Sequence, residues 1–240
     1  MPVSLALIEQ LREFETALLT EAMAAMGMTH AEPLHTGSDI RRLTSPAEPM
    51  VGVALALEVD TSTPGRAADP AGIWESYAWI QQSTAPVVVM MKCTGAELKR
   101  ECVAGDGMAK TYMAHGACGI VTDGGVRDLE RIDRTGLAVF GSGVTPNHAT
   151  LVYRISETPV TISGVTFATG DLVHGDGDGV IVVPERCHGG IVEACTLARD
   201  FETRAHLVFR RTGLALEEKR KRVADLYGAH QERCRALLAQ

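Results

Sequence analysis

The chain has 240 residues, enough to bury a sizeable hydrophobic core in one domain or at most two small ones. Its hydrophobic fraction of 45% and charged fraction of 22% are ordinary for a folded globular protein, and they exclude a disordered, collagen-like or coiled-coil chain. The formal net charge of -7 opposes binding to a phosphate backbone and disfavours nucleic acid as the main partner.

The spacing of the cysteines and the hydropathy of the sequence indicate the cellular compartment of the protein. The six cysteines are scattered without a CxxC pair, so the sequence predicts neither a zinc site nor a disulfide framework. No run approaches the roughly 20 consecutive apolar residues of a membrane helix, and the N-terminus turns amphipathic too soon for a signal peptide. We therefore expect a cytoplasmic protein with reduced thiols and no membrane association.

The first part of the chain predicts helices and strands in alternation. Over residues 4–26, apolar side chains recur every three or four positions, as in one amphipathic helix that stops at Gly27. A turn-rich segment at 61–72 precedes a helix that carries both tryptophans. The predicted order is helix 4–26, buried strand 51–60, helix 73–83, central strand 87–91, helix 107–115, strand 118–123, short helix 129–134 and strand 137–140.

The character of the sequence changes after Pro159. Short apolar runs broken by glycines predict a β-meander that closes the core. Residues 189–230 contain no proline and are rich in Arg, Glu, Leu and Ala, which indicates one or two long helices around Gly213. We expect an α/β catalytic domain over 1–188 and a helical extension over 189–240 that packs on a neighbouring subunit.

One loop stands out as a candidate site. It follows the strand at 118–123 and sets the guanidinium of Arg127 beside the carboxylate of Asp128. Ligands of open α/β sheets bind at the carboxyl ends of the strands. Upstream, Asp106 and Gly107 begin a helix, whose free amides and dipole favour an anion. These features predict a site for a carboxylic acid.

A purely structural interpretation competes with this one. Asp106 and Asp128 each precede a helix, and Asp is a favoured N-cap residue. Arg127 is equally consistent with a surface ion pair, and Gly124 and Gly125 with a simple turn. Taken by themselves, the residues leave both interpretations open.

The spacing of these residues resembles the signature of the RraA-like family. Asp106, twenty intervening residues and then Arg127-Asp128 are similar to the family's acid-X20-Arg-Asp pattern. The resemblance covers roughly residues 14–226. It includes the core motif from Ala114 to Asp128, the glycine-rich hairpin from Gly175 to Pro184, and the C-terminal helix at Leu197-Ala198-Arg199 with Glu202.

The resemblance implies a fold and an activity. The fold is a swivelling β/β/α sandwich, assembled as homotrimers or homohexamers with sites between subunits. Family enzymes include 4-hydroxy-4-methyl-2-oxoglutarate and 4-carboxy-4-hydroxy-2-oxoadipate aldolases, so we expect a metal-dependent lyase that cleaves a 4-hydroxy-2-oxo acid to pyruvate and also decarboxylates oxaloacetate. Two alternatives are a non-catalytic regulator of a ribonuclease or helicase, and a lyase or decarboxylase for a bulkier 2-oxo acid.

The resemblance also implies a metal centre. Asp128 would bind a divalent cation directly, and Asp106 would hold the waters of that cation. An all-oxygen, water-rich shell suits Mg²⁺ or Mn²⁺ rather than a metal that prefers thiolates. Glu202 of a neighbouring subunit is the candidate for a further acid, with a solvated helix face as the alternative.

Substrate contacts follow from the same resemblance. Arg127 would meet the keto or hydroxyl oxygen, while the amides of Gly107 and Met108 would bind the carboxylate. His115 and His148 are further candidates for substrate contact, but we predict structural roles because no paired His or Ser-His-Asp arrangement is visible.

Three departures from the family pattern leave the substrate open. The family usually has Gly-Asp before the central strand and a polar residue after it, where this chain has Ala85-Pro86 and Lys92-Cys93. Ala56 replaces a usual threonine, and the segment at 61–85 with its tryptophans is unusual. None of these positions belongs to the implied metal centre.

Overall fold

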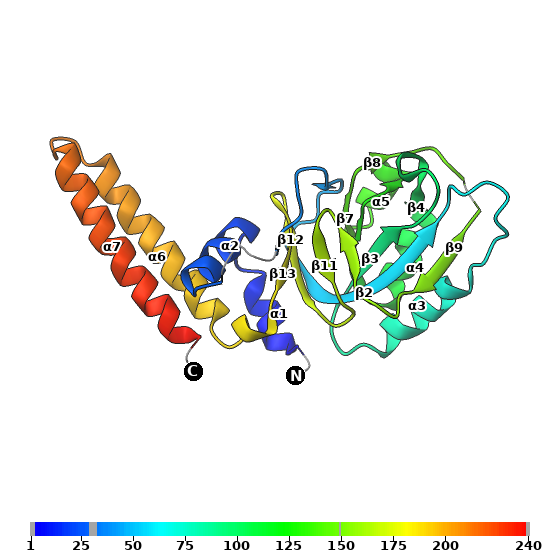
Figure 1. The fold of residues 1–240 in the computed structure, drawn as a ribbon, viewed down its shortest axis with the longest axis horizontal. Coiled ribbons are helices and arrows are strands. Elements are labelled where there is room, and N and C mark those ends of the chain that lie inside the picture. Colours follow the sequence, from blue (N-terminus) through cyan, green and yellow to red (C-terminus); the bar gives the residue numbers. More distant parts are fainter. Residues whose placement is uncertain (1–2, 29–32, 149, 239–240) are drawn as a thin grey trace.

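The computed structural model describes residues 3–28, 33–148 and 150–238. A mixed sheet forms the body, helices pack around it, and a helical hairpin projects away from it (Figure 1). The helices are α1 Leu5–Leu11, α2 Thr16–Ala25, α3 Ala71–Gln82, α4 Asp106–His115, α5 Leu129–Asp133, α6 Ile191–Arg210 and α7 Leu216–Leu237, with 3-10 turns η1 Leu98–Arg100 and η2 Glu185–Cys187. The strands are β1 Arg41–Arg42, β2 Met50–Asp60, β3 Val87–Cys93, β4 Cys102–Ala104, β5 Ala117–Thr122, β6 Gly125–Val126, β7 Ala138–Gly141, β8 Gly143–Val144, β9 Val152–Ile155, β10 Val160–Ile162, β11 Val165–Phe167, β12 Leu172–Asp176 and β13 Gly179–Val183.

The main sheet has the strand order β1-β7-β5-β3-β2-β12-β13. Strands β2, β3, β5 and β7 are parallel, whereas β12 and β13 run antiparallel at one edge. The long strand β2 pairs with β12 near its start and with β9 near its end. A small parallel sheet, β4-β6-β8, completes the fold. The predicted strands and helices between residues 51 and 140 are thus confirmed.

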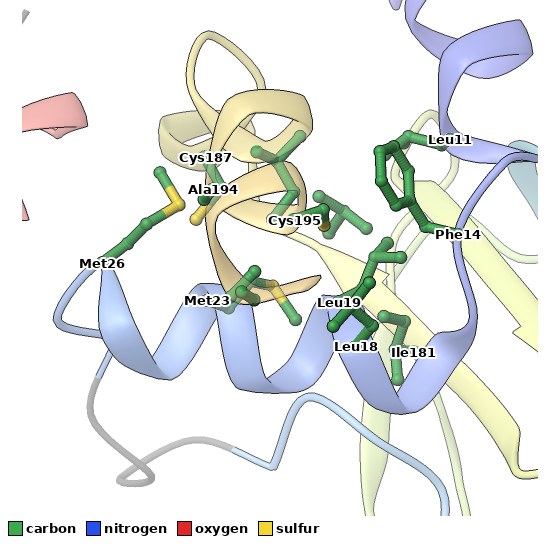
Figure 2. Close-up of a cluster of buried hydrophobic side chains, with 14 of the residues drawn as sticks. Leu11, Phe14, Leu18, Leu19, Met23, Met26, Ile181, Cys187, Ala194 and Cys195 are labelled. Atoms are coloured by element: carbon green, nitrogen blue, oxygen red, sulfur yellow. The ribbon is translucent and has the colours of Figure 1, made fainter. Parts of the chain in front are cut away.

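Alternation along β2 separates two of the three hydrophobic clusters. Leu55 and Leu57 face the side covered by α3 and α4, while Ala54 and Ala56 face the β10–β11 hairpin. The third cluster joins α1, α2 and α6 to the outer side of the β12–β13 hairpin (Figure 2). Because side chains on both faces are buried, β2 reads as a nearly continuous apolar run.

The prediction of a single helix over 4–26 is wrong, because the helix is interrupted between α1 and α2. Buried polar groups of β12 hold the break. The ring of His174 bonds Thr16 Oγ1 through Nδ1 at 2.9 Å and the Leu11 carbonyl through Nε2 at 3.2 Å. Thr16 N donates to Asp176 Oδ2 at 2.8 Å. Helical periodicity continues across the break, so the pattern of apolar residues could not reveal it.

The predicted β-meander after Pro159 is also corrected. The segment forms two separate hairpins, β10–β11 and β12–β13, and β11 does not pair with β12. Strand β12 pairs instead with β2, and the connection is tied down by Gly170 N to Ala54 O at 2.9 Å and Ala54 N to Asp171 O at 2.8 Å. Strand β12 therefore pairs with the edge of β2 rather than with β11.

Two long helices form the C-terminal part, as predicted, and Gly213 takes a positive φ of 79° in their connection. The first turns of α6 pack on α2, so the buried cluster crosses the predicted domain boundary at residue 188. The rest of the hairpin extends from the body (Figure 1). Its packing on a neighbouring subunit stays a prediction. No helix in the described part of the chain is long and apolar enough to cross a membrane.

Candidate active site

Parallel pairing of β4 with β6 builds the candidate site. Their register places Ala104 beside Val126, and Arg127 N donates to Ala104 O at 2.9 Å. Each strand leads at once into a helix, β4 into α4 at Asp106 and β6 into α5 after Asp128. Two loops that are some twenty residues apart in sequence therefore end side by side at one edge of the small sheet.

Gly105 is the point of closest approach between these loops. A β-carbon at this glycine would lie 2.8 Å from Asp128 Oδ2 and 2.9 Å from Arg127 Nε. The backbone just before Asp106 thus lies directly against the Arg127-Asp128 pair. Because Gly105 has no side chain, the carboxylate of Asp128 and the guanidinium of Arg127 have room beside it.

The side chain of neither aspartate makes the N-cap hydrogen bond that the structural interpretation predicted. Helix α4 has Gly105 at its N-cap, so Asp106 lies within the first turn. Asp128 occupies the N-cap position of α5, but its side chain makes no capping hydrogen bond. Its main-chain carbonyl accepts from Arg131 N at 2.8 Å and Ile132 N at 3.0 Å. The Asp128 carboxylate is consequently not used to begin α5, whereas the Asp106 carboxylate is also hydrogen-bonded to the Gly107 backbone.

Asp128 has a left-handed backbone, with φ 58° and ψ 32°. Among the described non-glycine residues, only Ser163 shares a positive φ, and this conformation is costly for most L-residues. The side chain is 36% exposed, and its Oδ2 lies 3.5 Å from Arg127 Nε. The backbone therefore turns the carboxylate toward the guanidinium and solvent rather than onto the helix amides.

Asp106 is held as a carboxylate by a neighbouring cation. Its Oδ2 lies 2.8 Å from Lys110 Nζ, one turn later in α4, and the side chain is 22% exposed. This hydrogen bond and the positive charges of Lys110 and Arg131 lower the pKa of Asp106. The negative charge on this residue is therefore present throughout the neutral range.

Three adjoining cavities form one cleft over these residues. The first cavity, of about 250 Å³, is lined by Gly107 and Met108. The second, of about 580 Å³, is lined by Asp128, and the third, of about 670 Å³, by the loop at 61–65. Arg127 borders the first and second, and segment 145–148 connects both to the third. The cleft thus runs from the start of α4 past Arg127 to the 61–65 loop.

The sequence did not identify two parts of this cleft. His148, predicted to be structural, lines the first and third cavities with Asn147. The loop at 61–65 lines the third. Its distance of some 80 residues from segment 145–148 concealed this arrangement, because no local pattern records it. His115 agrees with its predicted structural role, since its ring stacks on Tyr77 with centroids 5.1 Å apart.

Glu202 lies far from the cleft of its own chain. It belongs to α6, on the opposite side of the body from α5 (Figure 1). There it faces Glu21 of α2, whose pKa is raised by burial, by the charge of Glu202 and by a hydrogen bond with it. Only a neighbouring subunit would bring Glu202 to a cleft, so its role stays a prediction.

The donor set of the cleft bears on a metal ion. In the described parts of the chain, no three His, Cys, Asp or Glu side chains gather closely enough to form a complete metal site. Asp106 and Asp128 supply two carboxylates. The Cys102 thiol, which lines the first cavity, has a pKa raised by burial and stays protonated. One or two carboxylates with several waters is the usual environment of Mg²⁺, so the residues fit such an ion.

Comparison with protein families and curated proteins gives consistent matches. The family model RraA-like (Aldolase/RraA) matches residues 16–182. The protein DlpA of Legionella pneumophila is 32% identical over 121 residues, which are 50% of this chain and 20% of that protein. A protein of Halalkalibacterium halodurans, named "Putative 4-hydroxy-4-methyl-2-oxoglutarate aldolase", is 36% identical over 88 residues, 35% of this chain and 40% of that protein. The chain thus spans less than half the length of these two relatives.

Solved structures match over more of the chain. An uncharacterized protein of Pseudomonas syringae pv. tomato has a TM-score of 0.68 at 23% identity, covering 92% of this chain and 95% of that one. Streptomyces coelicolor RraAS2, described as an unusual member of the RNase ES inhibitor RraA protein family, has a TM-score of 0.67 at 24% identity, covering 88% and 99%. These likenesses confirm the predicted α/β sandwich with C-terminal helices.

Proposed function

The chain belongs to the RraA-like (Aldolase/RraA) family, and from that premise we propose that it is a metal-dependent carbon–carbon lyase. It cleaves a 4-hydroxy-2-oxo acid to pyruvate by a retro-aldol reaction and decarboxylates oxaloacetate as a side activity. The observation that carries this proposal is the β4–β6 pairing, which brings Asp106 and Arg127-Asp128 to one cleft and leaves the Asp128 carboxylate free of a capping bond.

The two aspartates would hold the cation, Mg²⁺ or Mn²⁺. Asp128, turned outward by its left-handed backbone, would be the direct ligand, and Asp106 would hold waters of the ion. When bound, the cation supplies Lewis acidity that neutralises negative charge developing on the substrate's keto oxygen. The lowered pKa of Asp106 keeps this residue ionised, and therefore able to accept hydrogen bonds from those waters, at neutral pH.

The start of α4 and Arg127 orient the substrate. The amides of Gly107 and Met108 belong to the first turn of a ten-residue helix, where amides lack intrahelical partners and the dipole favours an anion. They bind the carboxylate of the 2-oxo acid. Arg127 is permanently charged and borders the same cavity, so it donates a fixed hydrogen bond to the keto or hydroxyl oxygen. The enolate formed by bond cleavage is held between these groups.

The assembled protein would be a homotrimer or homohexamer in the cytoplasm. The domain of residues 1–188 would carry the cleft, and the extension of residues 189–240 would pack on a neighbouring subunit. Exposed Leu207, Phe209 and Leu216 near the tip of the hairpin support such packing. Glu202 of the neighbour would add a further acid to the cleft. The six cysteines are free, which suits a reducing compartment.

The test is pyruvate release from oxaloacetate and from 4-hydroxy-4-methyl-2-oxoglutarate, with Mg²⁺ or with EDTA. We expect release that requires the metal, that is lost in Asp106→Ala, and that persists in the surface control Glu157→Gln. A folded, metal-loaded protein that releases pyruvate from neither acid would contradict the proposal. A pull-down with ribonuclease and helicase partners would then test whether the protein is a regulator. Assays with bulkier 2-oxo acids would test whether it is a lyase or decarboxylase for such substrates.

A further inference from the structure

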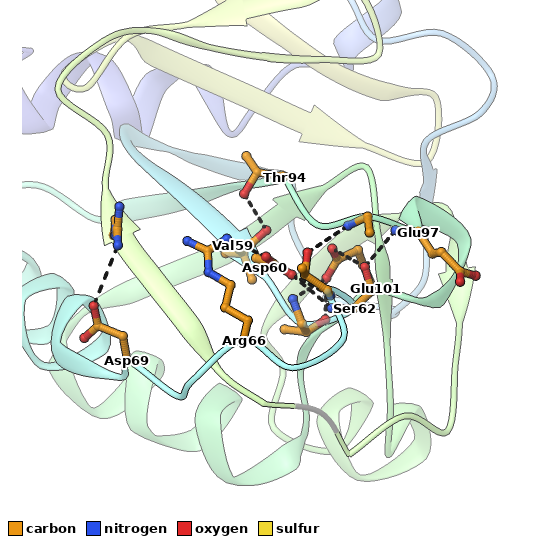
Figure 3. A network of polar contacts seen from close by, with 12 residues as sticks. Val59, Asp60, Ser62, Arg66, Asp69, Thr94, Glu97 and Glu101 are labelled. Carbon is orange, nitrogen blue, oxygen red and sulfur yellow. Dashed lines mark hydrogen bonds and ion pairs between the residues drawn. The ribbon is translucent and has the colours of Figure 1, made fainter.

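A buried carboxylate lies behind the third cavity of the cleft. Glu101 is 0% exposed, and its side chain accepts hydrogen bonds from Thr61 N at 2.7 Å, from Ser62 Oγ at 2.8 Å and from the Thr61 hydroxyl (Figure 3). All three donors are electrically neutral. A buried carboxylate is costly unless its hydrogen bonds are satisfied, so this set of bonds fixes the loop that supplies them.

The same residue connects that loop to the strands of the candidate site. Thr61 Oγ1, which donates to Glu101, accepts from Cys102 N at 2.9 Å. The main-chain carbonyl of Glu101 accepts from Gly125 N at 3.1 Å. Cys102 begins β4 and Gly125 begins β6, the two strands that lead to Asp106 and to Arg127-Asp128. Glu101 thus lies between the 61–65 loop and the residues proposed to do the chemistry.

A second set of bonds holds the far side of the loop. Ser62 Oγ accepts from Glu97 N at 2.9 Å, and Thr63 Oγ1 accepts from Ala96 N at 3.1 Å. Gly95 lies between the end of β3 and Ala96. A β-carbon at Gly95 would overlap the Glu101 carboxylate. The loop is therefore fastened at several points around one buried carboxylate.

The third cavity adjoins the first. Asn147 and His148 line both, and Asn147 Nδ2 donates to Thr61 O at 3.3 Å and to Arg100 O at 3.1 Å. The space bounded by the 61–65 loop is therefore the neighbour, across Asn147 and His148, of the cavity at the start of α4. That space presents hydroxyl, amide, imidazole and guanidinium groups, which suit a polar substituent.

We propose that the third cavity binds the polar far end of the substrate, and that Glu101 is the positioning residue that fixes its wall. This inference rests on the proposed lyase function and adds the determinant of substrate length. Oxaloacetate ends at its C4 carboxylate, whereas a 4-hydroxy-2-oxo acid that continues beyond C4 places its far carboxylate further from the start of α4. In this proposal only the longer acid reaches the third cavity, so the two kinds of substrate depend differently on the 61–65 loop.

The experiment compares the wild-type protein with Glu101→Gln, which removes acceptor capacity without changing size, and with the exposed control Glu157→Gln. For 4-hydroxy-4-methyl-2-oxoglutarate we expect KM to rise about tenfold in Glu101→Gln, the scale of one lost hydrogen bond to a charged group. For oxaloacetate we expect kcat and KM within about twofold of wild type. Ser62→Ala, which removes a donor to Glu101 without touching β4, should reproduce this split and covers the case in which Glu101→Gln does not fold.

Amide hydrogen exchange of residues 61–65 provides a readout that does not depend on turnover. We expect faster exchange there in Glu101→Gln and unchanged exchange in Glu157→Gln. Unchanged exchange would overturn the positioning role, even if the wild-type protein acted on neither acid and the lyase proposal itself had failed. Faster exchange with an equal loss of activity on both acids would overturn the role in substrate length.

Discussion

Gly105 packs so closely against Asp128 that a β-carbon on the glycine would lie 2.8 Å from the carboxylate Oδ2. Arg127 Nε would be 2.9 Å from the same carbon. Both contacts are shorter than normal van der Waals separations. The position of the Arg127 and Asp128 side chains against this backbone thus depends on the absence of a side chain at residue 105.

Gly105→Ala should therefore push the Arg127-Asp128 pair out of place. We expect kcat/KM for pyruvate release to fall at least about tenfold. The unfolding free energy should change little, because the β-carbon meets the ends of partly exposed side chains that can move aside. Gly228→Ala is the matched control, because a β-carbon there meets nothing within 4 Å and alanine favours a helix interior. Full activity in a folded Gly105→Ala protein would show that the close approach does not matter to the chemistry.

Asp128→Asn isolates the charge of the proposed metal ligand. Asparagine tolerates the left-handed backbone that Asp128 adopts, whereas alanine adds a strain of about 1–2 kcal/mol. We expect Mg²⁺-dependent turnover to fall by about two orders of magnitude or more. Calorimetric titration with Mg²⁺ should show weaker binding in this variant and normal binding in the surface control Asp178→Asn. Equal Mg²⁺ affinity in all three proteins would remove Asp128 from the metal site.

Lys110 controls the ionisation of Asp106. Its hydrogen bond is the largest contribution to the lowered pKa of the carboxylate, so Lys110→Met should move that pKa back up toward its ordinary value. The acid limb of the pH–rate profile should then shift to higher pH, with activity near pH 8 little changed. Lys99→Met, in an exposed stretch, should leave the profile in place. A profile that does not move in Lys110→Met would show that Asp106 ionisation does not limit turnover.

Burial of His174 predicts a pH dependence of stability. Desolvation lowers the pKa of this histidine in the folded protein, so the folded state favours the neutral ring. Its stabilising contribution is complete above the unfolded pKa of about 6.5 and is lost as the pH falls below that value. Chemical unfolding of the wild-type protein should show this decline.

The variant His174→Gln should show a weaker decline of stability over the same pH range. At pH 7 it should be less stable by about 1–3 kcal/mol, because the Thr16 and Leu11 partners lose a buried hydrogen-bonding ring. Equally steep pH dependence in both proteins would assign the acid sensitivity to another group.

Local sequence patterns predicted much of the fold correctly. Apolar runs and glycine punctuation located β2, β3, α4, β5 and the two long C-terminal helices, because burial on one or both faces imposes a period that can be read directly. The pattern failed where a partner distant in sequence decided the outcome. His174 and Asp176 interrupt the N-terminal helix, and β2 captures β12 at its edge.

For the candidate site, the sequence by itself supplied the residue types and their spacing: Asp106, Gly107, Arg127 and Asp128, with a family resemblance that gives them proposed roles. Only the tertiary structure decided that the Asp128 carboxylate makes no capping bond, that Gly105 lies against Arg127 and Asp128, and that Glu101 is buried behind a third cavity. The physical reason is that periodicity records which side chains are buried near one another along the chain. The pairing of β4 with β6 and the desolvation of a single carboxylate depend on contacts between segments that carry no shared local signal.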